Sequence, residues 1–175
     1  METEFELRGY TVKIEPDNDA TPPDDWNDRD FIATTRNRYF EKKGPNGEDA
    51  SEVDENREEL EKDYHIFPLY MYQHSGTALS LTPFSCPWDS GQVGFLLVSK
   101  NDLPEGLENK QAECIIEQWN QYLSGDIWGY IIEDGDGGEI DSCWGFYGFD
   151  YCKEEAISNV PDATFVGKDN DETDD

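Results

Sequence analysis

The sequence is poor in basic residues, in histidine and in long apolar runs, and each shortage removes a class of function. Only 13 lysines and arginines accompany 41 aspartates and glutamates, and there are two histidines. We find no zinc-ligand spacing, phosphate-binding glycine loop or basic nucleic-acid patch. No apolar run approaches the roughly 20 residues of a membrane-spanning helix, and the opening METEFELRGY has no apolar signal core. We therefore expect no direct nucleic-acid binding, no membrane insertion and no secretion.

The cysteines also lack a paired pattern. Cys86, Cys114, Cys143 and Cys152 contain no CxxC spacing. Without an export signal, reduced thiols in a cytoplasm are the simplest expectation. Cys114 and Cys143 are predicted to fill core positions as small apolar residues. No metal and no other cofactor is predicted.

Acidic residues are the dominant feature of the chain. The net charge is −28, and residues 1–63, 64–132 and 133–175 contribute −11, −5 and −12. The two ends therefore hold most of the charge, and the middle holds most of the apolar pattern. Such a protein is repelled by nucleic acid and by anionic membranes, and it is attracted to basic surfaces with a strength that salt reduces.

The apolar periodicity predicts an α+β fold, with a mainly antiparallel sheet of about six strands and two or three packed helices. Strands are expected at 2–15, 29–43, 65–84, 91–100 and 126–147, and helices within 51–64, 102–126 and 150–159. One domain is expected over 1–166, with an acidic portion at 1–63 and an aromatic, β-rich core at 64–160. The acidic stretch 167–175 is expected to be a disordered tail.

Several local features carry more specific expectations. Ser51 and Asp54 resemble a capping box at the start of the 51–64 helix. In the turn SCPWDSGQVG, Trp88 is expected to plug the core. Trp26, in a loop rich in Pro and Asp, is either an anchor onto the domain or an exposed partner contact. The second arm of the hairpin at 126–147 is expected to share one apolar face among Ile140, Trp144 and Phe146.

Carboxylates in three segments are the candidate contacts for a basic partner. They lie on the first strand, on the first helix and at the tip of the hairpin: Glu2, Glu4, Glu6, Glu52, Glu55, Glu58, Glu59, Asp134, Asp136, Glu139 and Asp141. A solvated helix face is the plainer interpretation of the helical set. The hairpin tip, DGDGGEID, could attract calcium, but its flanks are strands and its spacing does not match an EF-hand loop.

Two strings in the chain are distinctive. HSGTALSLTPFSCPWDSGQVGFLLVSK is followed by a hairpin that ends in DSCWGFYG. This pattern resembles a family of small phage- and prophage-encoded proteins of uncharacterised function, over about residues 64–155. The resemblance implies a mobile-element origin and assigns no activity or catalytic residue.

The first functional interpretation is a counter-defence inhibitor that mimics nucleic acid. B-DNA carries one charge per about 1.7 Å of axis, so 28 charges correspond to about 14 base pairs, or about 48 Å. A folded chain of this length has a radius of gyration of about 16 Å, which is a similar scale. Its carboxylates would block the nucleic-acid channel of a basic host nuclease, such as a CRISPR effector or a restriction enzyme, in the cytoplasm of the host cell.

Two other interpretations remain open. A protein adapted to a high-salt habitat would be equally acidic without any mimicry, although such adaptation should coat the whole surface rather than the two ends. A small enzyme could use His74, Cys86 and Asp89, which include the residue types of a nucleophile, a base and an orienting acid. These residue types alone do not supply the geometry that catalysis needs.

Overall fold

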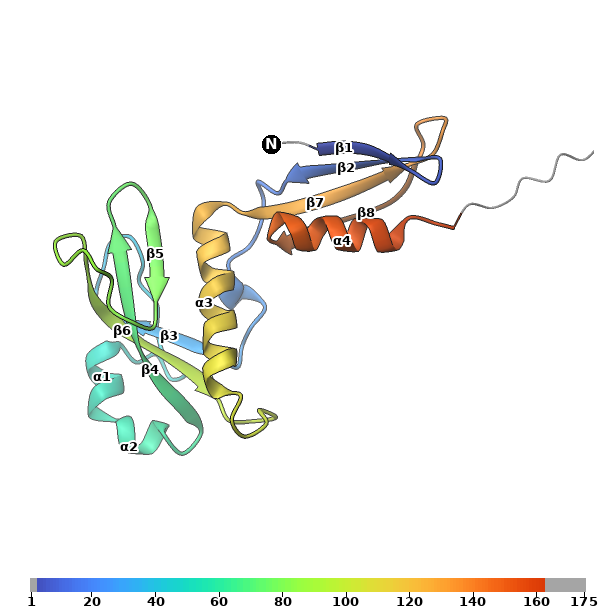
Figure 1. The fold of residues 1–175 in the computed structure, drawn as a ribbon. Coiled ribbons are helices and arrows are strands. Elements are labelled where there is room, and N and C mark those ends of the chain that lie inside the picture. The colour runs from blue at the N-terminus through green and yellow to red at the C-terminus, as the bar shows by residue number, and fades with distance from the viewer. Residues whose placement is uncertain (1–2, 163–175) are drawn as a thin grey trace, which may run out of the picture. The chain divides into compact units, whose positions relative to one another are not determined.

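The computed structural model describes residues 3–162, which form two compact units. One is built from two segments, residues 3–17 and 128–162, and is called the split unit here. The other, the central unit, is the continuous segment Asn18–Ile127. The structure contains two four-stranded antiparallel sheets and four α-helices, one sheet in each unit (Figure 1). The predicted α+β class is confirmed, although the strands number eight rather than about six.

The split unit packs one helix on one face of its sheet. The strand order is β1 (Thr3–Leu7), β2 (Tyr10–Pro16), β7 (Ile127–Glu133) and β8 (Glu139–Tyr147), and α4 (Phe149–Asn159) follows β8. Val12 and Ile14 alternate along β2 and are fully buried, as is Ile132 on β7. They pack against Cys152 and Ala156 of α4, which lies along this face of the sheet in Figure 1.

The first predicted strand, 2–15, is two strands joined by a tight turn. Arg8 and Gly9 both have positive φ angles, 54° and 86°. Two successive positive φ values suit the right-handed twist of a two-residue hairpin. The Arg8 guanidinium donates a hydrogen bond to the carbonyl oxygen of Val160 at 2.9 Å and so attaches this turn to the chain after α4.

The central unit buries both faces of its sheet. The strand order is β3 (Phe31–Thr34), β6 (Ser90–Ser99), β4 (Tyr64–Gln73) and β5 (Thr77–Ser80). Leu96 and Val98 of β6 face α3 (Glu108–Ser124), and Leu97 faces α1 (Ala50–Glu55) and α2 (Arg57–Leu60). A strand covered on both sides has no need for polar alternation, which explains the unbroken apolar run at 95–98. The short η1 helix (Pro23–Asp25) precedes β3.

Two expectations about the first predicted helix are corrected by the structure. The helix predicted over 51–64 begins at Ala50 and is interrupted at Asn56, and Tyr64 already belongs to β4. Its N-cap is Asp49, which forms a full capping box with Glu52, rather than Ser51. The described residues of the domain expected over 1–166 form two compact units, which divide at 17/18 and 127/128 because β2 pairs with β7. The tail predicted at 167–175 lies outside the described residues.

Three side chains predicted to be buried are on the surface. Cys114 and Cys143 are exposed, and Cys152 is the buried cysteine. Cys114 lies outside the buried stripe of α3, which consists of Ala112, Ile115, Ile116 and Trp119. Trp88 is 93% exposed and is not a core plug. Trp26 is 51% exposed.

Candidate anionic interface

One face of the split unit's sheet carries carboxylates and a partly exposed indole, which suit a surface that binds a basic partner. The strand register aligns Glu4, Lys13 and Ile131 across β1, β2 and β7, and likewise Glu6, Thr11 and Glu133. These side chains point away from the face on which α4 packs, because their neighbours Val12, Ile14 and Ile132 point toward that helix. We call the surface formed by Glu4, Glu6, Thr11, Lys13, Glu15, Ile131, Glu133 and Trp144 the open face.

Three carboxylates, those of Glu4, Glu15 and Glu133, act on a single ammonium group on the open face. Lys13 Nζ lies 2.7 Å from Glu133 Oε1. The hydrogen bond to Glu133 raises the pKa of Lys13 above its ordinary value of 10.5, against the opposing effect of burial, and Glu4 and Glu15 also raise it. Alternate side chains on a strand are about 6.8 Å apart, and neighbouring strands about 4.8 Å. The carboxylates therefore form a spaced array rather than one tight cluster.

An indole lies beside these carboxylates. Trp144 covers Gly129 so closely that a Cβ atom at residue 129 would fall 2.1 Å from the indole Cε3. Gly129 is aligned with Glu15, which places Trp144 on the open face, and 45% of its surface is exposed. Phe146 instead packs with Tyr130 on the helix side. The expected sharing of one face by Trp144 and Phe146 is therefore wrong: Gly145, at φ 86°, interrupts the alternation between them.

The open face includes two of the predicted contacts on the first strand. Glu4 and Glu6 are both exposed, whereas Glu2 lies outside the described residues. Glu15 and Glu133 belong to the same surface but were missed by the sequence analysis. Alternation in TVKIE was the available signal for Glu15. Glu133 could be assigned only once the pairing of β2 with β7 was known.

The acidic hairpin tip uses most of its carboxylates internally. Asp134 Oδ1 accepts hydrogen bonds from the backbone N–H groups of Asp136 and Gly138, at 2.9 and 2.8 Å. Asp141 accepts one from the Tyr130 hydroxyl, and Glu139 accepts one from Ser142. Among residues 3–162, no group of three His, Cys, Asp or Glu side chains converges to hold a metal ion. Asp134 therefore closes the turn at the hairpin tip through its hydrogen bonds to the backbone.

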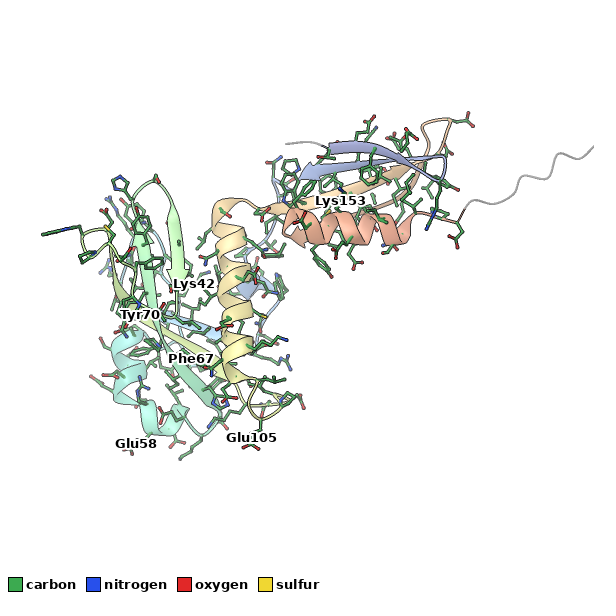
Figure 2. The ribbon with its side chains drawn as sticks, in the orientation of Figure 1. Lys42, Glu58, Phe67, Tyr70, Glu105 and Lys153 are labelled. Carbon is green, nitrogen blue, oxygen red and sulfur yellow. The ribbon has the colours of Figure 1, made fainter. Side chains whose placement is uncertain are left out.

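The predicted helical carboxylates belong to the central unit and do not form one continuous row. Glu52 is occupied by the capping box, and Glu59 forms an ion pair with Lys62. The interruption at Asn56 separates Glu55 from Glu58. Both of these side chains are exposed, and Figure 2 shows Glu58 directed outward from α2. They remain available to a partner, independently of the open face.

The structure brings His74, Cys86 and Asp89 together, but in an order that does not suit a thiol nucleophile. His74 Nδ1 lies 3.7 Å from Asp89 Oδ1, and the Cys86 thiol donates a hydrogen bond to Asp89 Oδ2 at 3.5 Å. The carboxylate therefore stands between the thiol and the imidazole. A general base must contact the nucleophile that it activates, and here the thiol contacts the carboxylate. The three side chains instead fasten the turn before β6 to the end of β4, together with the hydrogen bond from Gln73 N–H to the Asp89 carbonyl oxygen.

Within residues 3–162, no helix is both long enough and apolar enough to cross a membrane.

Comparisons with known proteins find no relative of this chain. No protein-family profile, no curated protein and no solved structure matches this chain.

Proposed function

We propose that this protein is an acidic counter-defence protein of a phage or other mobile element. It binds a basic nucleic-acid-binding protein of the host cytoplasm, such as a CRISPR effector or a restriction enzyme, and keeps nucleic acid out of its channel. The observation that carries the proposal is the open face, where Glu4, Glu6, Glu15 and Glu133 are spread over three neighbouring strands. The CPWDSGQVG and SCWGFYG strings support the mobile-element origin.

The charge of the split unit favours it as the contact. Its 50 described residues contain 13 acidic and three basic side chains, a net charge of −10, or one per five residues. The 110 residues of the central unit have a net charge of −13. A seven-residue strand is about 23 Å long, and the same length of B-DNA carries about 14 charges. The net charge of the whole split unit is therefore of the same order as that of a duplex segment as long as one of its strands.

The open face also offers more than charge. An exposed indole among carboxylates is suited to arginine and lysine side chains, because the ring face attracts cations. Tryptophan and arginine are also enriched among the residues that dominate binding energy at protein interfaces. Adaptation to high salt accounts for carboxylates but gives no reason to expose Trp144 beside them. Nucleic acid itself would be repelled by this surface.

Displacement of DNA tests the proposal directly. A fluorescent duplex bound to a purified CRISPR effector or restriction enzyme is titrated with the protein, and anisotropy is followed between about 50 and 200 mM salt. We expect displacement that weakens steeply as salt increases. Failure to displace DNA from any member of a panel of such nucleases would refute the proposal.

A matched pair of variants assigns the contact surface. Glu4→Gln/Glu6→Gln and Glu55→Gln/Glu58→Gln each remove two exposed charges, from the split and the central unit respectively. The first should weaken displacement about tenfold, and the second should change it little. The opposite result would move the contact to α1 and α2. Equal weakening by both would indicate a response to net charge alone and would overturn the assignment.

The salt-adaptation alternative makes a separate prediction. A protein adapted to high salt unfolds when salt is removed, since carboxylate repulsion is then unscreened. The proposed inhibitor must stay folded in a dilute-salt cytoplasm. Circular dichroism with and without molar potassium chloride distinguishes the two.

A further inference from the structure

One edge of the central unit's sheet, formed by β5, faces a groove beside α3. β5 lies at the end of the strand order and pairs with β4 on one side only. The space between β5 and α3 has a volume of about 670 Å³. Its lining comprises 77–82 along the strand and, along the helix, Glu113, Ile116, Glu117, Asn120, Gln121 and Ser124.

Asn120 occupies the position that another strand would take. Its side-chain Oδ1 accepts a hydrogen bond from the Leu79 N–H at 2.7 Å, and its Nδ2 donates one to the Leu79 carbonyl oxygen at 2.9 Å. This is the pair of bonds that a residue of an added antiparallel strand would form. The backbone groups of Leu79 therefore point into the groove. Those of Thr77, two residues earlier on β5, point the same way.

The walls of the groove indicate the chemistry of its occupant. Two exposed carboxylates, Glu113 and Glu117, stand on the helix side, and none of the lining residues is basic. Leu79 and Ile116 are almost fully buried and provide an apolar floor. The strand side spans 77–82, of which Thr77–Ser80 form β5, and four extended residues measure about 13 Å. The groove thus fits an extended segment with apolar and basic side chains.

We propose that the groove binds an extended basic segment of a partner protein by strand addition to β5. The Asn120 side chain occupies the backbone groups of Leu79 in the free protein and is displaced on binding. The segment's backbone replaces the Asn120 carboxamide at Leu79, its apolar side chains lie over Ile116, and its lysines or arginines face Glu113 and Glu117. This site is in the central unit and does not depend on the function proposed for the open face.

Peptide binding to the full-length protein tests this inference. The probe is a fluorescent peptide of about six residues that alternates lysine and valine. Its control has the same sequence but methylated backbone nitrogens, so that it keeps the charge and loses the donors that strand addition needs. We expect the control to bind at least about tenfold more weakly. Equal affinity of the two peptides would overturn the inference, because attraction to an acidic protein would then suffice.

Variants of the protein separate the groove from general electrostatics. Glu113→Gln/Glu117→Gln should weaken peptide binding several-fold more than Glu55→Gln/Glu58→Gln, which removes the same charge outside the groove. Asn120→Ala should tighten binding about tenfold, because the peptide no longer competes with two hydrogen bonds. If the two double variants had equal effects, the site would not be this groove. Unchanged or weaker binding by Asn120→Ala would show that the Asn120 side chain does not compete with the peptide.

Discussion

Lys13 donates a hydrogen bond to Glu133 across 2.7 Å, and this contact joins β2 to β7, strands from opposite ends of the split unit's sequence. Because the pKa of Lys13 is raised in the folded state, the stabilisation from this pair is complete below pH 10.5. It is lost as the pH rises through the folded-state pKa.

The pair is tested by urea unfolding of the wild type and of Lys13→Met. We expect the wild type to be more stable at about pH 8, and this advantage to shrink as the pH rises above 10.5. Lys13→Arg is the control, because the guanidinium stays protonated over this range. A difference between wild type and Lys13→Met that did not change with pH would contradict this account.

Gly129 is predicted to be required by Trp144. The Gly129→Ala methyl group would meet the indole at 2.1 Å, so the ring must move at a cost of about 1–3 kcal/mol in the free energy of unfolding. The same substitution in a Trp144→Ala background should cost much less, and a double-mutant cycle by urea unfolding measures the difference. Additive effects would mean that the two residues do not touch.

Gly94 is predicted to be still less replaceable, because its neighbour is backbone. A Cβ atom at residue 94 would lie 1.9 Å from the carbonyl oxygen of Ala33, so β3 and β6 would have to separate. We expect Gly94→Ala to lower the free energy of unfolding by about 3 kcal/mol. Gly91, on the same strand, has open space around it, and Gly91→Ala should stay within about 0.5 kcal/mol. Equal effects at the two glycines would count against the β3–β6 register.

The capping box at α1 predicts a difference between Asp49 and Ser51. Asp49 accepts hydrogen bonds from the backbone N–H groups of Ser51 and Glu52, so Asp49→Ala should cost about 0.5–2 kcal/mol. Ser51→Ala should be nearly neutral. Thermal unfolding of the two variants, followed by circular dichroism, distinguishes them. A larger effect at Ser51 would restore the cap expected from the sequence.

The exposure of Trp88 predicts that it contributes little to folding. At 93% exposure, Trp88→Ala should change the free energy of unfolding by less than about 0.5 kcal/mol. Trp119 is 4% exposed and packs edge-on against Phe40, so Trp119→Ala should cost about 3–5 kcal/mol. Urea midpoints measure both. A substantial loss at Trp88 would mean that the indole packs after all.

Local patterns predicted local structure well. The helix expected within 102–126 is observed as α3, and the hairpin expected at 126–147 is observed as β7 and β8. The partition into two sheets could not be read in the same way, because the β2–β7 pairing joins residues that are far apart in sequence. Periodicity along one strand says which side chains share a face but not which strand lies beside it.

Part of the open face could be predicted, because alternation along one strand shows which side chains share a face. Alternation placed Glu4 and Glu6 together, whereas Glu133 depended on a distant pairing. The cap at Asp49 was missed although Glu52 is the residue type that a capping box needs at N3, whereas Asp54 is not. The exposure of Trp88 and Trp144 shows that the burial of an aromatic side chain cannot be predicted from its place in a strand-rich segment.

The interleaved order of the two units has a consequence for synthesis in the cell. The central unit is one uninterrupted stretch and is complete once residue 127 has left the ribosome. β2 must wait for β7, which ends at residue 133. At about 5–20 residues per second, nascent β1 and β2 remain without their partner strand for several seconds. During that time the hairpin's apolar Val12 and Ile14 are uncovered, and the glutamates beside them supply the repulsion that discourages aggregation between neighbouring nascent chains.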